Sequence, residues 1–309
     1  MPIYRLFDMP RKGSDFALMN RQTRSENISY GISEVTHADL QGLIEAGNSY
    51  DGIEFPFTIN ELPSSLDELP TTLLYSANHM ILGLLCIYDW SGIELYGLVH
   101  PTYRRSGIGH ALLATAKEAA QQREFKHLLL GCYGSISAGT AFAGAQGATF
   151  EHADYHMELD VNRIQRPAIK HTELTLRLVE PAEIKHVASI AAQAFGEPEE
   201  EMCAWLTRDV LKPDRRIFFI ELQRNPIGTI RIVEGARGQA DITLFSLLQP
   251  YRRRGYGMQI LLSSVDMLLS ERCSHIALDV TTSNSHALAL YQACGFQEIR
   301  RDSYYKLTL

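Results

Sequence analysis

Two short turns of this 309-residue chain carry residues suited to binding an anion. They are YRRSGIG, residues 103–109, and YRRRGYG, residues 251–257, and each stands between a strand-like run and a helix-like run. Glycine permits a left-handed backbone and a close ligand, and the N–H groups of a helix's first turn attract negative charge. Because arginine adds positive charge, each turn predicts a phosphate or pyrophosphate site.

The spacing within these turns excludes two familiar phosphate-binding loops. Neither turn has the GxxxxGK[ST] pattern of a Walker loop, and Ile260 and Leu112 stand where the GxGxxG dinucleotide fingerprint needs its third glycine. Both turns share R-x-x-G-x-G instead. The residues expected to contact the ligand are Arg252, Arg253, Arg254, Gly255, Tyr256, Gly257 and Met258 in the second turn, and Arg104, Arg105, Gly107, Ile108 and Gly109 in the first.

The two turns belong to a longer internal repeat. The offset of 148 residues that relates Gly107 to Gly255 also relates several other pairs, namely Arg104 and Arg252, His127 and His275, and Gly147 and Gly295. One offset that persists over this length indicates two copies of a domain. The chain length agrees, since single hydrophobic cores seldom grow beyond about 250 residues.

The copies and their elements follow from this repeat. We expect an extension at 1–25, a first domain at 26–160, a polar linker at 161–173 and a second domain at 174–309. The second copy predicts strands at 174–179, 216–223, 227–234, 240–248, 275–281 and 296–308, and helices at 181–195, 199–210, 256–270 and 285–293. The first copy predicts strands at 71–76, 80–89, 93–99 and 127–132 and a helix at 108–121. This mixture predicts an α/β (α+β) fold with a mixed central sheet and helices on both faces in each domain.

A second motif follows the second turn. In HIALDVTTSNSHALALYQACGFQEI, residues 275–299, a strand leads to Asn284, a short helix ends near Tyr291, and Gly295 and Phe296 follow. Together with R-x-x-G-x-G, this segment resembles the GNAT superfamily of N-acetyltransferases, whose loop binds the pyrophosphate of acetyl-coenzyme A. The resemblance covers 174–309, and the first copy is similar through its loop and its strand–helix order. It implies two tandem GNAT domains and acetyl-CoA as the cofactor.

The resemblance implies roles for residues of the second copy. Tyr291 would protonate the leaving thiolate, because a phenol of pKa near 10 can give a proton to a thiolate of pKa about 8.5; alternatively it is a core aromatic. Asn284 would contact the pantetheine arm, or it caps a helix or turn. A backbone amide near the end of the strand at 240–248, at Leu247 or Leu248, would polarise the thioester carbonyl.

The acceptor amine also needs a base, since only the neutral amine attacks and its pKa is about 10.4. Asp241 stands early on the strand, in a position similar to that of a carboxylate in some members of the family. An exposed carboxylate at the strand end is an equally weighted alternative. Glu234 is a weaker rival for the base.

The first copy lacks these groups. The offset places Ala143 opposite Tyr291, Ile136 opposite Asn284 and Ile93 opposite Asp241, and Ser106 replaces Arg254. We therefore expect the catalytic centre in the second copy, and a first copy that binds coenzyme A without turnover or is structural. A non-catalytic acyl-CoA sensor is the alternative for the whole chain, and Tyr291 and Asn284 favour the enzyme.

Composition narrows the remaining classes. A net charge of −7 gives no support for a nucleic-acid partner. The five cysteines form no CxxC pair, so we expect no metal site. Free thiols also favour a location in the reducing cytoplasm. No signal peptide is expected, and the apolar run at 79–90 is too short to cross a membrane. The acceptor is a small-molecule or peptide amine, and the acidic segment at 197–210 with Trp205 suggests a cationic one or is a solvated helix face.

Overall fold

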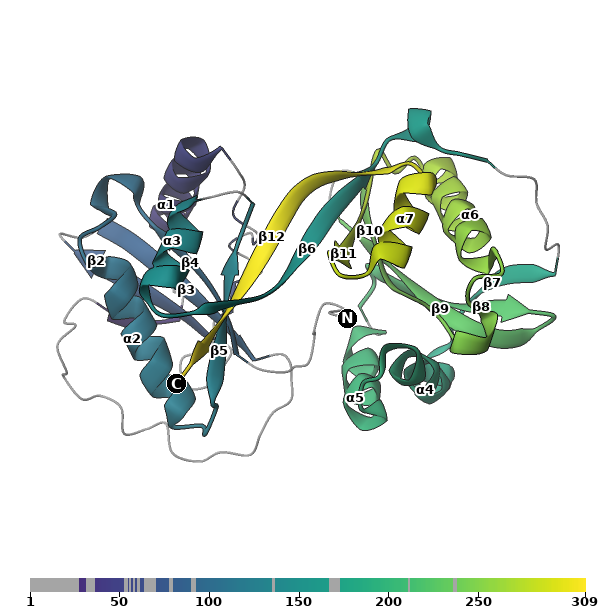
Figure 1. Cartoon of the computed structure of the whole chain (residues 1–309), viewed down its shortest axis with the longest axis horizontal. Coiled ribbons are helices and arrows are strands. Elements are labelled where there is room, and N and C mark those ends of the chain that lie inside the picture. The colour runs from purple at the N-terminus through teal and green to yellow at the C-terminus, as the bar shows by residue number, and fades with distance from the viewer. Residues whose placement is uncertain are drawn as a thin grey trace. The chain divides into compact units, whose positions relative to one another are not determined.

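The computed structural model describes residues 28–31, 37–52, 55, 57, 59, 62–63, 71–77, 80–89, 93–134, 137–166, 173–210, 212–235 and 238–309. These residues form two compact units (Figure 1). The C-terminal unit comprises Ala153–Arg301. The N-terminal unit comprises the described residues from 28 to 152 together with Asp302–Leu309. The predicted extension at 1–25 lies outside the described residues.

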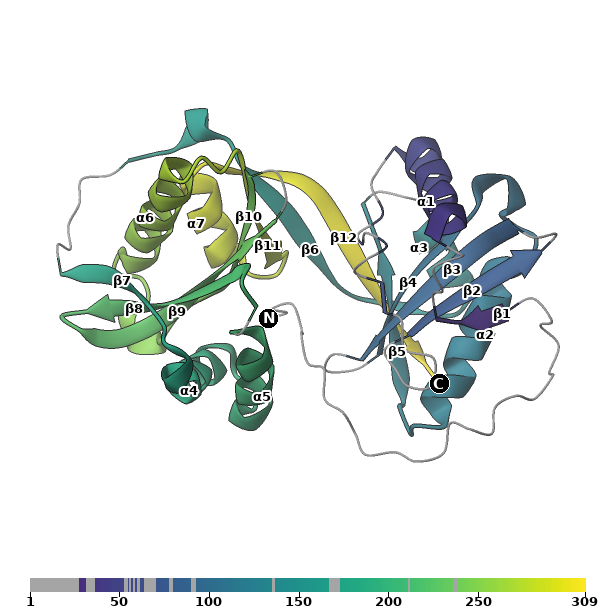
Figure 2. The same ribbon diagram turned by 180° about the vertical axis from the view of Figure 1, so that it is seen from behind.

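The N-terminal unit is a sheet with helices on both faces. Its strands are β1 (Ile28–Tyr30), β2 (Thr71–Ala77), β3 (Met80–Asp89), β4 (Ile93–Val99) and β5 (His127–Cys132), and its helices are α1 (His37–Asp51), α2 (Ile108–Gln121) and α3 (Ser137–Ala145). The strand order is β1-β2-β3-β4-β5-β12, and only β4 and β5 are parallel. Figure 2 shows α1 and α2 over opposite faces of β2–β4.

The C-terminal unit repeats this plan. Its strands are β7 (Leu174–Leu178), β8 (Arg215–Leu222), β9 (Asn225–Glu234), β10 (Gln239–Leu247) and β11 (His275–Thr281), and its helices are α4 (Ile184–Phe195), α5 (Glu199–Asp209), α6 (Tyr256–Ser270) and α7 (Ser285–Ala293). The strand order is β6-β11-β10-β9-β8-β7, and only β10 and β11 are parallel. The predicted α/β class, with a mixed sheet and helices on both faces, is confirmed.

The last strand of each copy is exchanged. β6 (Thr149–Leu159) begins in the N-terminal unit, but its residues 154–158 pair with β11 of the C-terminal unit. β12 (Phe296–Thr308) begins in the C-terminal unit, and its residues 303–308 pair with β5, near the C-terminus in Figure 1. The compact units therefore differ from the contiguous ranges 26–160 and 174–309. The two exchanged strands occupy equivalent places: each is antiparallel to the strand that follows the helix after the R-x-x-G-x-G turn.

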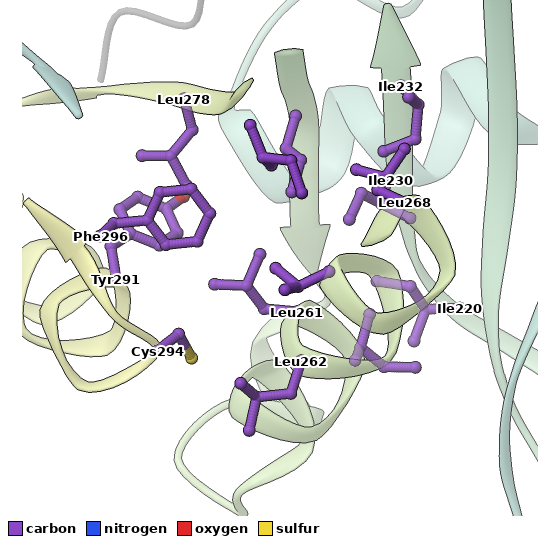
Figure 3. Close-up of a cluster of buried hydrophobic side chains, with 14 of the residues drawn as sticks. Ile220, Ile230, Ile232, Leu261, Leu262, Leu268, Leu278, Tyr291, Cys294 and Phe296 are labelled. Atoms are coloured by element: carbon purple, nitrogen blue, oxygen red, sulfur yellow. The ribbon is translucent and has the colours of Figure 1, made fainter. Parts of the chain in front are cut away.

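Alternation along the strands divides the C-terminal core into two layers. In β8, Phe218 and Ile220 face α6 and α7, whereas Ile217 and Phe219 face α4 and α5. Figure 3 shows part of the first layer, in which Leu268 of α6 lies beside Ile230 and Ile232 of β9. Burial of each aliphatic side chain contributes roughly 1.5–3 kcal/mol to the free energy of unfolding. The two layers therefore fix the positions of the strand ends that carry the candidate site.

Candidate active site

The two R-x-x-G-x-G turns have the same backbone conformation. Arg253 and Gly255 adopt φ of 61° and 86°, and Arg105 and Gly107 adopt 66° and 91°. In each turn the left-handed glycine is the N-cap of the following helix and makes no side-chain cap. The first hydrogen bond of α6 runs from the N–H of Gln259 to the carbonyl of Gly255 at 3.2 Å, so the N–H groups before it face out of the helix N-terminus. The binding of an anion by these N–H groups stays a prediction.

The second glycine of each turn has a packing function as well. A Cβ added at Gly257 would lie 3.2 Å from Cδ2 of Leu290, and one added at Gly109 would lie 3.3 Å from Cε2 of Phe142. Glycine thus lets α7 and α3 approach the helices that follow the turns. In the N-terminal unit Ile108, the first residue of α2, is buried. In the C-terminal unit Tyr256, the first residue of α6, is buried and Met258 is half-buried.

The first arginine of each turn is committed to the protein itself. Arg252 donates from Nε to the Leu247 carbonyl and from Nη2 to the Ala194 carbonyl, both at 2.7 Å. Arg104 donates from Nε to the Val99 carbonyl at 3.2 Å, and its two Nη atoms bind the Asp51 carboxylate at 2.8 and 2.6 Å. These arginines tie the turn to a strand end and a helix end. The exposed Arg253 and Arg254 are better placed for a phosphate than Arg252.

This difference predicts opposite phenotypes for neighbouring arginines. Arg252→Ala removes two charge-assisted hydrogen bonds and is expected to cost about 1–3 kcal/mol of stability. Arg253→Ala is expected to raise the KM for the expected cofactor, acetyl-CoA, several-fold with little change in melting temperature. Within the part of the chain that the structure describes, the Arg253 side chain makes a long 3.3 Å approach from Nη2 to Nε2 of the exposed His286. Thermal unfolding and initial rates of both variants check this, and a stable Arg252→Ala protein with lost cofactor affinity would reverse the assignment.

Strand β10 has a bulge close to the turn. Its register with β9 shifts between Thr243 and Ser246, and Leu244 adopts φ of 48°, which is uncommon for a non-glycine residue. The equivalent strand β4 pairs with β3 from Ile93 to Val99 without a shift. The bulge is therefore a feature of the C-terminal unit within the compared strands.

The bulged strand separates the two predicted amide donors. The N–H of Leu248 donates to the Ile227 carbonyl at 2.9 Å, so the expectation that this amide polarises a thioester is wrong. Because successive N–H groups of a strand point to opposite sides, the N–H of Leu247 points away from β9 and toward β11. β10 pairs with β11 only from Gln239 to Asp241, so this N–H lies beyond the paired stretch. That the Leu247 amide polarises a thioester stays a prediction.

Tyr291 lies in the core beside the turn. Its side chain is 8% exposed, and its ring centroid lies 6.4 Å from that of Phe245 and 6.3 Å from that of Phe296. Figure 3 shows it against Phe296, with Cys294 nearby. Burial, and then the neighbouring Cys294 and Asp279, raise the pKa of Tyr291 above its ordinary value of 10.0. The phenol is therefore protonated at neutral pH, as an acid must be, while its ring is a core side chain.

Asn284 is the N-cap of α7. Its Oδ1 accepts a hydrogen bond from the N–H of Ala287 at 3.2 Å. The structure thus bears out the capping alternative for its oxygen. The cap stabilises the start of α7, which is the helix that carries Tyr291.

Asp241 lies near the start of β10, and its side chain has an exposed part. Desolvation of its carboxylate by the surrounding strands, and then the Asp279 carboxylate, raise the pKa of Asp241 to about 6, while His156, Arg215 and Arg231 act in the opposite direction. The rival base Glu234 is engaged elsewhere, since its Oε1 lies 2.7 Å from Nε of Arg216. A carboxylate of pKa near 6 is ionised at neutral pH and basic enough to accept a proton.

Sequence reasoning missed Asp279 and His156. Nδ1 of His156 lies 3.0 Å from Oδ1 of Asp279, across the β6–β11 pair. The internal repeat could have pointed to Asp279. The 148-residue offset places Gly131 at the equivalent position of the first copy, so only the second copy has a carboxylate there. No signal pointed to His156, because it belongs to the exchanged strand.

The equivalent region of the N-terminal unit is filled with aromatic rings. Ala143 and Ile93, the counterparts of Tyr291 and Asp241, are 0% and 1% exposed. A Cβ at Gly131 would collide with the ring of Tyr96, whose hydroxyl donates to Oε2 of Glu94 at 2.6 Å. Around Tyr96 pack Phe57, Tyr88 and Tyr133. Ile136, the counterpart of Asn284, lies outside the described residues.

Two further expectations concern metals and membranes. Within the described ranges, no group of three His, Cys, Asp or Glu side chains is arranged to hold a metal ion. Among the helices that the structure describes, none is long and apolar enough to cross a membrane.

Comparison with known proteins finds related acetyltransferases. The model of the acetyltransferase (GNAT) family matches residues 46–140 and 184–296. A mycothiol acetyltransferase of Renibacterium salmoninarum is 24% identical over 229 residues, which are 67% of this chain and 65% of that protein. The N-alpha-acetyltransferase MAK3 of Arabidopsis thaliana is 30% identical over 66 residues, 21% of this chain and 35% of that protein. The chain thus matches less than two thirds of the length of either relative.

Solved structures agree on the fold. A GCN5-related N-acetyltransferase from Sphaerobacter thermophilus has a TM-score of 0.74 at 18% identity, covering 92% of this chain and 96% of that one. A tandem GNAT protein from the clavulanic acid biosynthesis pathway has a TM-score of 0.68 at 17% identity, covering 91% and 98%. Two consecutive domains of this fold therefore span most of the chain.

Proposed function

Because the chain belongs to the acetyltransferase (GNAT) family, we propose that it is an N-acetyltransferase that moves an acetyl group from acetyl-CoA to a primary amine. We place its catalytic centre in the C-terminal unit. The observation that carries this proposal is that Tyr291 and Asp241 belong to that unit, whereas the N-terminal unit has buried Ala143 and Ile93 in their places.

The residues of the C-terminal turn fit the pyrophosphate of coenzyme A. Gly255 opens the helix N-terminus, no side chain caps it, and Arg253 and Arg254 are exposed beside it. Gly257, Tyr256 and Met258 complete the first turn of α6. The side-chain NH2 of Asn284 is the part that would donate to the pantetheine arm, since the cap uses only Oδ1. When bound, acetyl-CoA supplies an activated thioester carbonyl.

The side chains of this unit would then divide the chemistry. Asp241 accepts the proton of the acceptor amine, directly or through a water, as its nitrogen becomes a nucleophile. The N–H of Leu247 donates to oxygen charge that develops on the carbonyl. Arg252 supports this by holding the Leu247 carbonyl at 2.7 Å. As the amine nitrogen bonds to the carbonyl carbon and the C–S bond breaks, Tyr291 gives its proton to the departing thiolate; the phenol regains a proton, and Asp241 releases the one taken from the amine, before the next turnover.

Replacement of Asp241 by asparagine is expected to lower kcat/KM about 100-fold at pH 8, because the acceptor amine loses its base. The wild-type rate should rise with pH through about 6, where the Asp241 carboxylate ionises. That rise should be absent from Asp241→Asn. A pH–rate profile of kcat/KM checks both points. Glu234→Gln is the matched control, and a loss confined to Glu234→Gln would identify the rival as the base.

Asp241→Asn is also expected to change how the stability of the protein depends on pH. The folded-state pKa of Asp241, about 6, lies above its ordinary value of 3.8, so the native state holds this proton more tightly than the unfolded chain does. This contribution is present below pH 4 and is lost as pH rises to 6. Asp241→Asn should therefore gain melting temperature over the wild type between pH 4 and 7.

The acceptor is expected to be a cationic amine, because the proposed base Asp241 has a second carboxylate, Asp279, as its neighbour on the same face of the sheet. Trp205 is not available to contact the acceptor: its side chain is 8% exposed, and the Arg231 guanidinium lies 4.6 Å from the centre of its ring. A panel of small and peptide amines, followed by release of free thiol from acetyl-CoA, tests the proposal. Binding of acetyl-CoA without thiol release for any amine would favour an acyl-CoA sensor instead.

A further inference from the structure

Three charged side chains share one face of the C-terminal sheet. Asp241 of β10 pairs with Ala277 of β11, and Asp279 stands two residues further along β11. Because side chains two residues apart in a strand point to the same face, Asp241 and Asp279 are diagonal neighbours. His156 of β6 pairs directly with Asp279 and so joins them. The small side chain of Ala277 lies between Asp241 and Glu158 in the adjacent row.

The contacts of His156 arise within this cluster. Nδ1 lies 3.0 Å from Oδ1 of Asp279, and Nε2 lies 3.8 Å from Oε1 of Glu158. Burial lowers the pKa of His156, but Asp279 of β11 and Asp241 of β10 outweigh burial and Arg300 of β12, so the pKa is raised. The imidazole thus carries positive charge at neutral pH in a larger fraction of molecules than an ordinary histidine does. That charge faces two carboxylates that otherwise repel each other.

We propose that His156 is a positioning residue of the C-terminal site: it holds Asp279 beside Asp241 and keeps the Asp241 carboxylate ionised for the acceptor amine. The inference rests on the proposed function. It adds that the first half of the chain completes the active site of the second half, because His156 precedes the linker and reaches the site on the exchanged strand. The equivalent position in the N-terminal unit is Tyr304, opposite Gly131.

The proposal predicts opposite shifts for two neighbouring substitutions. His156→Gln removes positive charge and should move the acidic limb of the kcat/KM profile upward by up to about one pH unit, a loss of up to tenfold at pH 5.5 that shrinks above pH 8. Asp279→Asn should move the limb downward, because Asp279 acts on Asp241 more strongly than His156 does. General destabilisation cannot produce shifts of opposite sign.

The matched control is His275→Gln, which removes an exposed imidazole from the start of β11 and should leave the profile unchanged. All variants are made in the full chain, and circular dichroism confirms their folding. An unchanged limb in His156→Gln, or shifts of the same sign in both variants, would overturn the proposal while leaving the acetyltransferase assignment intact.

A readout without turnover separates the two ideas. Carbon NMR of the Asp241 carboxyl, assigned through Asp241→Asn, should titrate at higher pH in His156→Gln and at lower pH in Asp279→Asn than in the wild type. If the wild type acetylates no amine and these shifts are seen, the proposed function fails and the linkage stands. Titration of Asp241 that is the same in all three proteins rejects the linkage, whatever the activity.

Discussion

Tyr291→Phe is expected to lower kcat about 100-fold, the lower end of what a positioned acid contributes. The change removes one hydroxyl and keeps the ring that packs between Phe245 and Phe296, so the fold should stay intact. The KM for acetyl-CoA should change little, because the hydroxyl acts on the thiolate as it leaves. Burial keeps the pKa of Tyr291 above 10.0, so the wild-type rate should not fall between pH 7 and 9 through loss of this proton.

Tyr155→Phe is the matched control for this experiment. Tyr155 packs against the edge of the same hydrophobic core and is only partly buried, so Tyr155→Phe removes a hydroxyl near that core that has no proposed part in the reaction. Steady-state rates at saturating amine and thermal unfolding are measured for both variants. Equal kcat for Tyr291→Phe and the wild type would remove the acid role and leave Tyr291 as a core residue.

The internal repeat provides an equally direct test of which unit binds the cofactor. Gly255→Ala and Gly107→Ala place the same methyl group at equivalent N-caps with φ of 86° and 91°. A left-handed alanine costs about 1–2 kcal/mol, so both variants should lose a similar amount of stability. Only Gly255→Ala should raise the KM for acetyl-CoA, by about tenfold or more, because the methyl group obstructs the helix N-terminus that receives the pyrophosphate.

The comparison also decides whether the N-terminal turn holds coenzyme A. Calorimetric titration of coenzyme A into the wild type should give one site, and Gly255→Ala should weaken it while Gly107→Ala leaves it unchanged. Two sites in the wild type, with one weakened by each substitution, would show that the N-terminal turn retains the ligand. If Gly255→Ala has the same KM for acetyl-CoA as the wild type, the assignment of the catalytic turn is contradicted.

Local signals in the sequence were sufficient for most elements of the C-terminal unit. The helix predicted at 256–270 has those bounds, because Gly255 provides its start. The helix at 285–293 follows a capping Asn284 and ends before Gly295, whose φ is 97°. Strands predicted at 80–89, 93–99 and 127–132 are β3, β4 and β5. Each of these predictions depends on neighbouring residues alone.

Features that depend on contacts between residues far apart in the sequence were not predicted. Nothing in the pattern of β6 says whether residues 154–158 pair with their own copy or the other, since both sheets offer an equivalent edge. For the same reason His156 was invisible as a site residue. The hydrogen bond of the Leu248 amide follows from the register beyond the bulge at Leu244, which the sequence does not reveal. Arg252 reads as a phosphate ligand until its two carbonyl partners are known.

The exchange of β6 and β12 imposes an order on biosynthesis. Residues 303–308, which complete the sheet beside β5, leave the ribosome about 170 residues after that strand, a delay of roughly 10–30 s at ordinary translation rates. Until then the edge of β5 lacks its native neighbour. Nascent β6 is the competitor for that edge, since it holds the equivalent position in the other sheet. Ribosome pausing late in the message should therefore trap the earlier half of the protein, and a stop codon after residue 301 should damage the fold of the domain made first.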